Sequence, residues 1–566
     1  MRKNLKQLII PLLLIGLTFL IVKPLFSNRL LYSDDAELHA ARVANYYLAI
    51  KQGQIPPRFA PNLNSGYGYP VLNFVYPLPY IISTFIYMAL PVTIVVSLNL
   101  TIILLIVVGV LGVYFLARKF SLSQWGSAIT AGLYLTTPYS LINIYSRTAL
   151  GEIAFFAILP WVMWGIENLI KKKKINILFS LLSILSLALL LISHQPSFII
   201  TVPILIIYYW LRVKDKKQVI ILIKRIMPIG IISLLITAWH WLPVLWEKQY
   251  VILDRTDTIT NYLTQFPKHW SFFFHQITNL DRLNTFKTVS VGYSTWIIFL
   301  SSLWLIIKKK NTDKKIIIYL LGVIIFIAIL MMPFTKSVWL ISGLGNYLQY
   351  PWRLLSLLTL CTTLLFIHLS QIELFRNNHL LTAALIVTSV LSIIVYAHPR
   401  GFQNWSDYEL FEYFKTTTTF NEFQPIWAAE YTRHFTEEKI SFRIPKQKLY
   451  DDEILQPADY ANLKIQNWNG SQMLYVVETS KLVEVIQKTY YFPGWELLVD
   501  GQYQKINYED EEFPGHITYY LNPGQHQVRV QFTQNTSARK IGKYLVLMGI
   551  LGLGFHCSLI KKSKIN

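Results

Sequence analysis

Two adjacent carboxylates, Asp34 and Asp35, follow the first apolar run of the chain and open a short polar cluster. A third carboxylate at Glu37, an imidazole at His39 and a guanidinium at Arg42 complete the cluster. Such a set can act as a general base, hold a divalent metal ion or grip a phosphate group. We therefore expect catalysis from the three carboxylates and substrate binding from His39 and Arg42.

A helix that begins at this point gives the cluster a simple geometry. Residues three or four positions apart share a helix face, so Asp35, His39 and Arg42 would lie together. The alternative involves no chemistry: Asp34 caps the first turn and Glu37 pairs with a neighbouring side chain. The functional interpretation is favoured because polar groups are costly to keep at a membrane face.

Two candidate substrate-binding residues lie in the irregular stretch that follows. Arg58 comes directly after Pro56 and Pro57, and a guanidinium held by rigid neighbours suits a phosphate group. Tyr69 stands in a segment rich in glycine and proline. Its ring could stack on a sugar, or it could belong to the aromatic belt of the membrane interface.

Four further candidates come from later turns that the span pattern places at the same membrane face. Arg147 and Glu152 flank a predicted helix start, where they could bind a phosphate group or form a plain ion pair. His194 stands in a tight turn and could bind substrate or cap the next helix. Arg353, at another helix start, could contact a lipid phosphate or anchor its helix. We expect all four to bind substrate beside the acidic cluster.

The composition identifies the elements that must position these residues. Of the 566 residues, 53% are hydrophobic and 15% are charged, and the mean hydropathy is +0.39. Apolar runs of roughly twenty residues, the length that spans a bilayer, recur along the chain. The net charge of +21 lies in short basic clusters between these runs, which is typical of cytoplasmic loops and not of nucleic-acid binding. The sequence therefore predicts a polytopic helical membrane protein.

If the N-terminus is cytoplasmic and successive spans alternate in direction, both termini of this cell-membrane protein lie in the cytoplasm and the acidic cluster lies outside. About twelve spans are expected from the run lengths, near residues 8–26, 94–117, 125–142, 151–170, 175–193, 197–212, 219–246, 291–307, 315–334, 352–372, 379–397 and 541–560. The apolar stretch 70–90 contains prolines that interrupt helical hydrogen bonding, so we expect it to be re-entrant or interfacial. Residues 1–397 then form the transmembrane domain, with 27–93 as the first outer loop.

Residues 398–540 are a long polar stretch and are predicted to form a small extracytoplasmic β-sandwich. Alternation in segments such as 473–477 and 527–532 favours strands, and Asn522-Pro523-Gly524 supplies turn chemistry between them. Strands are expected from about residue 440, after a partly helical stretch. Residues 541–566 are predicted to be the last span and a cytoplasmic tail.

Several common nucleotide and cofactor motifs are missing from the sequence. There is no Walker A lysine, no dinucleotide glycine fingerprint, no Gly-x-Ser-x-Gly elbow and no His-Glu-x-x-His. A sugar or other group for transfer would therefore have to arrive on a lipid carrier. No cofactor is required by the pattern, and a divalent metal, Mg²⁺ or Mn²⁺, would have its ligands among Asp34, Asp35, Glu37 and His39.

As a set, these motifs resemble a family of bacterial integral membrane proteins labelled 6-pyruvoyl-tetrahydropterin synthase-related. The resemblance rests on Asp-Asp-x-Glu-x-His after the first span, on the Pro-Arg and Gly-Tyr-Pro segments, and on the motifs at 147–152, 193–194 and 351–353. That family looks like a branch of the GT-C glycosyltransferases. The segments 490–495 and 499–501 resemble the outer β domain of YfhO-type membrane proteins, which are linked to cell-wall glycosylation.

The resemblance implies a membrane enzyme that moves a sugar from a polyprenyl-phosphate carrier to a cell-envelope glycan, lipid or protein at the outer face. It implies that Asp34 or Asp35 is the base and that Arg58, Arg147 and Arg353 hold the lipid phosphate. The outer loop 247–290 could add acceptor contacts. The pterin label does not describe the activity, because the zinc-binding histidine triad of soluble pterin synthases does not occur here.

Two alternatives stay open. A lipid-linked glycan transporter or flippase would need polar residues along a path through the bilayer, and few charges lie in mid-span here. A non-catalytic subunit of cell-envelope assembly would bind a partner through the β domain. In either case the partners are lipid-borne or extracytoplasmic, and the bilayer itself is one of them.

Overall fold

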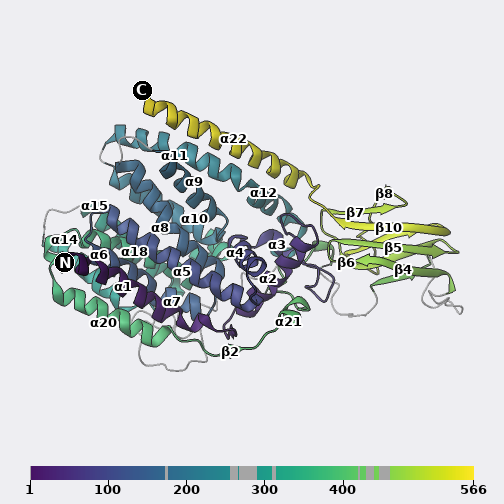
Figure 1. Ribbon diagram of the computed structural model, residues 1–566, viewed down its shortest axis with the longest axis horizontal. Coiled ribbons are helices and arrows are strands. Elements are labelled where there is room, and N and C mark those ends of the chain that lie inside the picture. Colours follow the sequence, from purple (N-terminus) through teal and green to yellow (C-terminus); the bar gives the residue numbers. More distant parts are fainter. Residues whose placement is uncertain are drawn as a thin grey trace.

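The computed structural model is a long helical bundle with a β-sandwich that projects from one end (Figure 1). The last helix, α22 (Ser537–Ile565), runs along the bundle from the sandwich, and both chain termini lie away from the sandwich (Figure 1). The structure describes residues 2–171, 176–213, 215–254, 266, 290–308, 314–418, 421–428, 439–444 and 459–565.

The longer helices form the bundle. With α22 they are α1 (Arg2–Val22), α5 (Ile94–Lys119), α6 (Gln124–Thr136), α7 (Pro138–Tyr145), α8 (Leu150–Lys171), α9 (Ile177–Leu191), α10 (Gln195–Arg212), α11 (Lys216–Ile236), α12 (Ala238–Glu247), α14 (Tyr293–Ile307), α15 (Lys314–Leu330), α18 (Leu355–Leu369) and α20 (His379–Tyr396). Shorter helical pieces connect them or lie between the bundle and the sandwich: η1 (Lys23–Phe26), α2 (Ala36–Lys51), α3 (Val71–Phe74), α4 (Leu78–Ala89), η2 (Lys248–Tyr250), η3 (Ile252–Asp254), η6 (Pro333–Thr335), α16 (Lys336–Ser342), α17 (Leu344–Leu348), η7 (Pro351–Leu354), α19 (Glu373–Arg376), α21 (Asp407–Phe411) and η8 (Ile426–Ala428).

Six helices of the described part are long and apolar enough to cross a membrane, and a seventh crossing is counted if α15 and the bent segment after it form one span. Shorter apolar helices include α9 and α14. A helical membrane protein is therefore confirmed. The count of about twelve spans, which rests on run length, and the sidedness of the termini stay predictions.

Two of the expected spans are broken helices. The run 125–142 is divided between α6 and α7 at Thr137, because Pro138 starts a new helix and the Thr137 side chain caps it. The run 219–246 is divided between α11 and α12 at Thr237, whose hydroxyl donates to the Ser233 carbonyl at 2.8 Å. The sequence did not predict these breaks, since hydropathy does not register them, and the count of spans stays a prediction.

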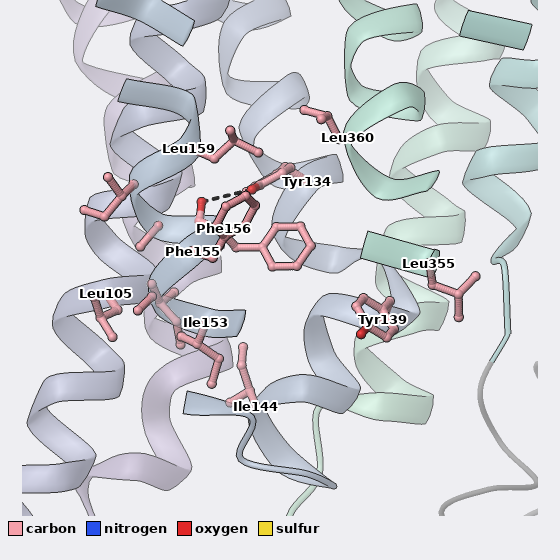
Figure 2. Packing of buried hydrophobic residues seen from close by; sticks show 14 of the residues in the cluster. Leu105, Tyr134, Tyr139, Ile144, Ile153, Phe155, Phe156, Leu159, Leu355 and Leu360 are labelled. Carbon is pink, nitrogen blue, oxygen red and sulfur yellow. Dashed lines mark hydrogen bonds between the residues drawn. The ribbon is translucent and has the colours of Figure 1, made fainter. Parts of the chain in front are cut away.

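Helix α8 contains a proline whose missing N–H is compensated by a neighbouring helix. Pro160 cannot donate to the carbonyl four residues earlier, that of Phe156. The Tyr134 hydroxyl of α6 donates to this carbonyl at 2.9 Å, as the dashed line in Figure 2 shows. A freed carbonyl inside a membrane bundle thus finds the partner that it needs.

The Tyr134→Phe variant is expected to lower the free energy of unfolding by about 1–3 kcal/mol, because it leaves a buried carbonyl without a donor. Thermal unfolding of the purified protein in nanodiscs measures the change. Tyr114→Phe, on the neighbouring helix α5, is the matched control and should leave the midpoint unchanged. Equal midpoints for both variants would show that the hydroxyl contributes nothing.

The core of the bundle lies where α5, α6, α7, α8 and α18 meet (Figure 2). Leu105, Ile153, Phe156 and Leu355 are among its buried side chains. Helices α5 and α8 approach closely at Gly109, where an added Cβ would lie 3.2 Å from the Ala157 backbone. Small residues allow this close packing when lipid gives no hydrophobic drive for association.

The stretch 70–90 forms α3 and α4 instead of one long helix. The 12 residues of α4 reach about 18 Å at 1.5 Å per residue, whereas the hydrocarbon core is about 30 Å thick. A helix of this length is too short to cross alone, and the re-entrant or interfacial course of the segment stays a prediction. It packs on α2 and α5, at the end of the bundle nearest the sandwich (Figure 1).

The strands of the C-terminal region make two antiparallel sheets. Five strands pair in the order β4-β5-β10-β7-β8, and three in the order β3-β6-β9. Tyr475 and Val528 of the first sheet pack with Val485 and Ile517 of the second in one buried core, so the sandwich architecture is confirmed. The strands are β3 (Ile440–Arg443), β4 (Ala461–Trp468), β5 (Gln472–Thr479), β6 (Val483–Tyr490), β7 (Trp495–Val499), β8 (Gln502–Gln504), β9 (His516–Leu521) and β10 (Gly524–Phe532).

Residues 400–440 were expected to be partly helical. Within the described residues of this stretch the helical pieces are α21 and η8, and most of the remaining residues form turns, bends and irregular chain. The strand β2 (Phe402–Gln403) pairs with β1 (Leu30–Leu31). The stretch is thereby held against the first outer loop, close to the acidic cluster.

Candidate active site

A backbone pairing brings the acidic cluster beside the segment that precedes α8. The N–H groups of Asp34 and Asp35 donate to the carbonyls of Ser146 and Arg147, each at 3.0 Å. Two segments that are far apart in the sequence are thereby aligned. The Asp35 carboxylate lies within electrostatic range of the Arg147 guanidinium as a result.

Helix α2 begins directly after Asp35, so His39 and Arg42 follow at helical spacing as the sequence predicts. His39 Nδ1 lies 2.8 Å from the Tyr80 hydroxyl, and Arg42 donates to the same hydroxyl at 3.1 Å. Arg42 also donates to the hydroxyl of Thr417 at 3.0 Å and to its carbonyl. The Arg42 guanidinium thus holds α2, α4 and the segment around Thr417 together.

Glu152 is the centre of a buried network at the start of α8. It accepts from the Tyr139 hydroxyl at 2.5 Å and from the Asn143 amide at 3.2 Å. Its other oxygen lies 3.1 Å from Arg147 Nη1 and 3.6 Å from Arg353 Nε. A carboxylate in the first turn of a helix is also favoured by the helix dipole. Glu152 therefore holds the guanidinium groups of Arg147 and Arg353 close to each other.

Arg147 and Arg353 lie against aromatic rings of the same turn. The Arg147 guanidinium carbon is 4.3 Å from the centroid of Trp352, and that of Arg353 is 5.3 Å from the centroid of Tyr350. Arg353 donates to the Leu348 carbonyl at 3.1 Å. Its Nε–H is buried and finds no acceptor within hydrogen-bond distance among the residues that the structure describes, with Glu152 at 3.6 Å. The side chain is 16% exposed, so its terminal N–H groups are those that an anionic group such as phosphate would contact.

His194 is linked to the same region by the ring of Tyr76, which lies close to both His194 and His39. It caps α10, with Nδ1 2.7 Å from the Ser197 hydroxyl. The Tyr76 ring centroid lies 5.5 Å from that of His194 and 6.4 Å from that of His39. This ring lies flat over Gly151, where an added Cβ would come within 2.5 Å of it. The glycine in the 147–152 motif is thus required by the close approach of Tyr76.

The charges gathered here favour an anionic ligand and a carboxylate that can accept a proton. Three guanidinium groups, those of Arg42, Arg147 and Arg353, interact electrostatically with the carboxylate of Asp35 or of Glu152. Asp35, which lies outside the membrane-spanning helices, is partly buried, and its carboxylate accepts no hydrogen bond from the described residues. Burial raises the pKa of the Asp35 carboxyl above its usual 3.8, while Arg147 and Arg42 oppose this rise.

The other two predicted catalytic carboxylates are directed elsewhere. Asp34 is exposed and forms an ion pair with Arg400 at 3.0 Å. Glu37 accepts a hydrogen bond from the Tyr413 hydroxyl at 2.8 Å. Within the described residues, the structure gathers no group of three metal-ligating side chains. Asp34, Asp35, Glu37 and His39 therefore do not fit a divalent metal site.

Arg58 and Tyr69 are not part of the cluster, contrary to the expectation that they bind the same substrate. Arg58 donates to Asn73 at 2.6 Å, to Gln534 at 2.7 Å and to the carbonyl of Trp239 at 2.8 Å. In a regular helix the Trp239 carbonyl would accept from the N–H of residue 243, which is a proline and has none. Arg58 supplies the missing donor.

Tyr69 holds the chain that runs beside the cluster. Its hydroxyl lies 2.6 Å from the Thr418 hydroxyl and accepts from the Phe423 N–H at 3.1 Å. The residue is fully buried. Its ring is therefore a structural support for this segment instead of an open sugar platform.

Sequence reasoning passed over two residues that complete the network. Tyr139 and Asn143 both contact Glu152 and Arg147. They precede Arg147 at intervals of four, which is the spacing of one helix face. That signal was present in the sequence. Most of loop 247–290, from which acceptor contacts are expected, lies outside the described residues, which end at 254 and resume at 290 apart from residue 266.

These features define a helical membrane protein with a β-sandwich and a buried arginine–carboxylate cluster at the helix starts of the bundle. Residues 72–400 match a family described as "6-pyruvoyl-tetrahydropterin synthase related domain; membrane protein", and the chain belongs to this family. Arg147, Glu152, His194 and Arg353 fall inside the matched residues, whereas the acidic cluster precedes them.

Other similarities are more distant. An uncharacterized protein of Lactococcus lactis subsp. cremoris is 24% identical over 234 residues, which cover 40% of this chain and 37% of that protein. Among solved structures, the mycobacterial arabinofuranosyltransferase AftD gives a TM-score of 0.43 at 16% identity, over 71% of this chain and 27% of AftD. The Archaeoglobus fulgidus oligosaccharyltransferase gives a TM-score of 0.40 at 13% identity, over 70% of this chain and 55% of that one. ArnT from Cupriavidus metallidurans, bound to undecaprenyl phosphate, gives a TM-score of 0.34 at 10% identity, over 66% of this chain and 62% of ArnT. Likenesses at this level assign neither the fold nor the activity.

Proposed function

We propose that the chain is a GT-C-type membrane glycosyltransferase that moves a sugar from a polyprenyl phosphate to an acceptor outside the membrane. The observation that carries this proposal is that the Asp35 backbone is hydrogen-bonded to that of Arg147, whose guanidinium group shares Glu152 with that of Arg353. The Asp35 carboxylate, which accepts no hydrogen bond from the described residues, is therefore held near these two cations. A base beside paired cations suits a transfer in which an acceptor loses a proton and a phosphate leaves.

In the proposed step, Asp35 removes the proton from an acceptor hydroxyl. The acceptor oxygen forms a bond with the anomeric carbon of the sugar, and the bond between that carbon and the phosphate oxygen breaks. The electron pair leaves with the polyprenyl phosphate, whose negative charge Arg353 and Arg147 stabilise. Glu152 positions the two arginines, and no step depends on a metal ion.

The proposed topology places this chemistry outside the cell membrane. Residues 1–397 form the transmembrane domain, 398–540 the extracytoplasmic domain and 541–566 the last span with a cytoplasmic tail. Both termini lie away from the sandwich (Figure 1), as expected if the membrane surrounds the bundle and separates the sandwich from the termini. The basic clusters at the cytoplasmic ends of the spans follow the positive-inside rule.

Transfer can be tested with the full chain in nanodiscs and a panel of radiolabelled polyprenyl-phosphate sugars, using envelope glycans, lipids and peptides as acceptors. The expected result is release of polyprenyl phosphate together with label in one acceptor class. Movement of an intact lipid-linked sugar across liposomes without transfer would contradict the proposal. So would the absence of turnover with every donor that binds.

The pH dependence of transfer should report the Asp35 carboxyl. The base acts when ionised, so activity is lost as the pH falls through its pKa, and the raised pKa places this loss above pH 3.8. Asp34 is a like charge that raises the pKa of Asp35, so Asp34→Asn should move the acid limb to lower pH. A pH–rate profile of both proteins measures the shift. An unchanged or upward shift would contradict the assignment of Asp35.

A further inference from the structure

Three hairpin turns meet at the end of the sandwich that lies away from the bundle. Strand β10 leads back to α22, so its first residues lie at this far end of the projecting sandwich (Figure 1). The antiparallel pairing of β10 with β5 and β7 brings the turns after those two strands to the same end. The imidazole of His526, near the start of β10, contacts two of the three turns.

His526 lies between the turn after β7 and the turn before β10. Its Nδ1 is 2.7 Å from a carboxylate oxygen of Asp500, and its Nε2 is 2.9 Å from the Asn522 carbonyl oxygen. The second carboxylate oxygen of Asp500 accepts from the Gln527 N–H at 2.8 Å, and the Asp500 N–H donates to the Gln527 carbonyl at 2.9 Å. These contacts hold both turns against the start of β10.

Both partners of the imidazole ring are hydrogen-bond acceptors. A carboxylate oxygen and a backbone carbonyl oxygen carry no proton, so each nitrogen of His526 must act as the donor. A neutral imidazole has a single N–H. In either neutral tautomer, one nitrogen would therefore present a lone pair to an oxygen. Both contacts are hydrogen bonds only when the ring is a charged imidazolium.

A paired aspartate and histidine can also serve as a general base, in which the carboxylate orients the ring and the second nitrogen accepts a proton. In this structure the second nitrogen, Nε2 of His526, already faces the Asn522 carbonyl. No ring nitrogen is left to take a proton from a substrate, so the charge of His526 has a structural role.

The charges around the imidazole were compared strand by strand. Among the described residues, the charge that acts on the ring is that of Asp500. Glu478 of β5 is paired with Gln525, and because successive strand residues point to opposite faces, its side chain lies on the face away from His526. Lys481, in the turn after β5, is exposed. The hydrogen bond to Asp500 is the main reason why the pKa of His526 is raised above its usual 6.5.

We infer that Asp500, His526 and the Asn522 carbonyl form a proton-dependent clasp, which closes the far end of the sandwich while the imidazole is charged and loosens when the ring loses a proton. Loss of the proton turns one of the two contacts into a repulsion between a lone pair and an oxygen. The clasp does not depend on the proposed function. In the proposed topology the sandwich lies outside the membrane, so the clasp follows the pH of the medium.

The pKa shifts define the pH range in which the clasp is closed. Because the pKa of His526 is raised, its contribution is fully present below the usual value of 6.5 and is lost as the pH rises through the raised pKa. The pKa of the Asp500 carboxyl is lowered below its usual 3.8, chiefly because it accepts from His526. Its contribution is therefore fully present above pH 3.8 and is lost only in stronger acid.

Hydrogen exchange of the full chain in nanodiscs, followed by mass spectrometry between pH 5 and pH 9 and corrected for the intrinsic pH dependence of exchange, tests the clasp. Protection of the segments 498–503 and 520–528 is expected to fall by about two- to fivefold as the pH rises through the pKa of His526, in line with the strength of exposed charge pairs. In His526→Gln this protection should be low throughout. His379→Gln, at an exposed histidine of the bundle, is the matched control and should keep the pH dependence.

Asp500→Asn gives a second test that does not remove the histidine. Asp500 has a φ of +52°, a conformation that asparagine tolerates well, so the turn should be retained. Without the negative charge, the pH at which protection is lost should move to a lower value. Protection that does not change with pH in the unmodified chain, an equal pH dependence in His526→Gln, or an unmoved midpoint in Asp500→Asn would each overturn the inference.

Discussion

The Asp35→Asn variant is expected to lower the transfer rate by roughly 10²–10⁴-fold, the usual contribution of a general base. The amide has the same shape but cannot take the acceptor proton. Folding should be retained, because the carboxylate accepts no hydrogen bond from the described residues and the Asp35 N–H still donates to the Arg147 carbonyl. Single-turnover transfer with the preferred donor measures the loss, and the thermal midpoint checks the fold.

Asp34→Asn is the matched control for this experiment. Asp34 has the same chemistry one residue earlier, but it is exposed and pairs with Arg400. Exposed ion pairs contribute only about 0–1 kcal/mol, so this variant should lose far less activity at neutral pH. Equal losses in the two variants, or full activity of Asp35→Asn, would remove Asp35 from the role of base.

The Glu247→Gln variant is expected to destabilise the protein by about 3–5 kcal/mol, because it leaves a buried arginine without its counter-charge. Glu247, at the end of α12, lies 2.9 Å from Arg539 in α22, and each side chain is 1% exposed. Glu247 also accepts from Asn73 and from Thr536. The pair therefore joins the first outer loop, the bundle and the helix that leaves the sandwich.

Thermal unfolding in nanodiscs is again the measurement. Glu373→Gln makes the same change in an exposed pair, where Arg376 lies 4.0 Å away, and should alter the midpoint little. A double variant, Glu247→Gln with Arg539→Gln, removes the uncompensated charge and should recover part of the loss. A single Glu247→Gln variant as stable as the control would mean that this pair does not secure the sandwich.

Much of the architecture was readable from the sequence because it depends on long patterns. Apolar runs predicted helices in nearly every place where the structure has them, and alternation predicted strands from residue 440 onward. The breaks at Thr137 and Thr237 were missed, because each depends on one hydrogen bond or cap that hydropathy averages away. The pairing of β2 with β1 was also missed, since it joins segments that are far apart in the sequence.

The composition of the candidate site was harder to predict than its location. Spacing along α2 indicated that Asp35, His39 and Arg42 share a face, and the turns at 147–152, 194 and 353 indicated groups at one membrane face. Spacing could not indicate which donors are already used. Arg58 lies in a turn as favourable as that of Arg353, but its donors are taken by Asn73, Gln534 and a carbonyl freed by proline. Such partners come from distant parts of the chain and are visible only in three dimensions.

A structure of the full chain in nanodiscs with a polyprenyl phosphate bound tests the central claim most directly. The account predicts the phosphate within hydrogen-bond distance of Arg353 and Arg147 and close to the Asp35 carboxylate. A phosphate bound at another place on the bundle, with the Arg147–Glu152–Arg353 network unchanged and closed, would contradict it.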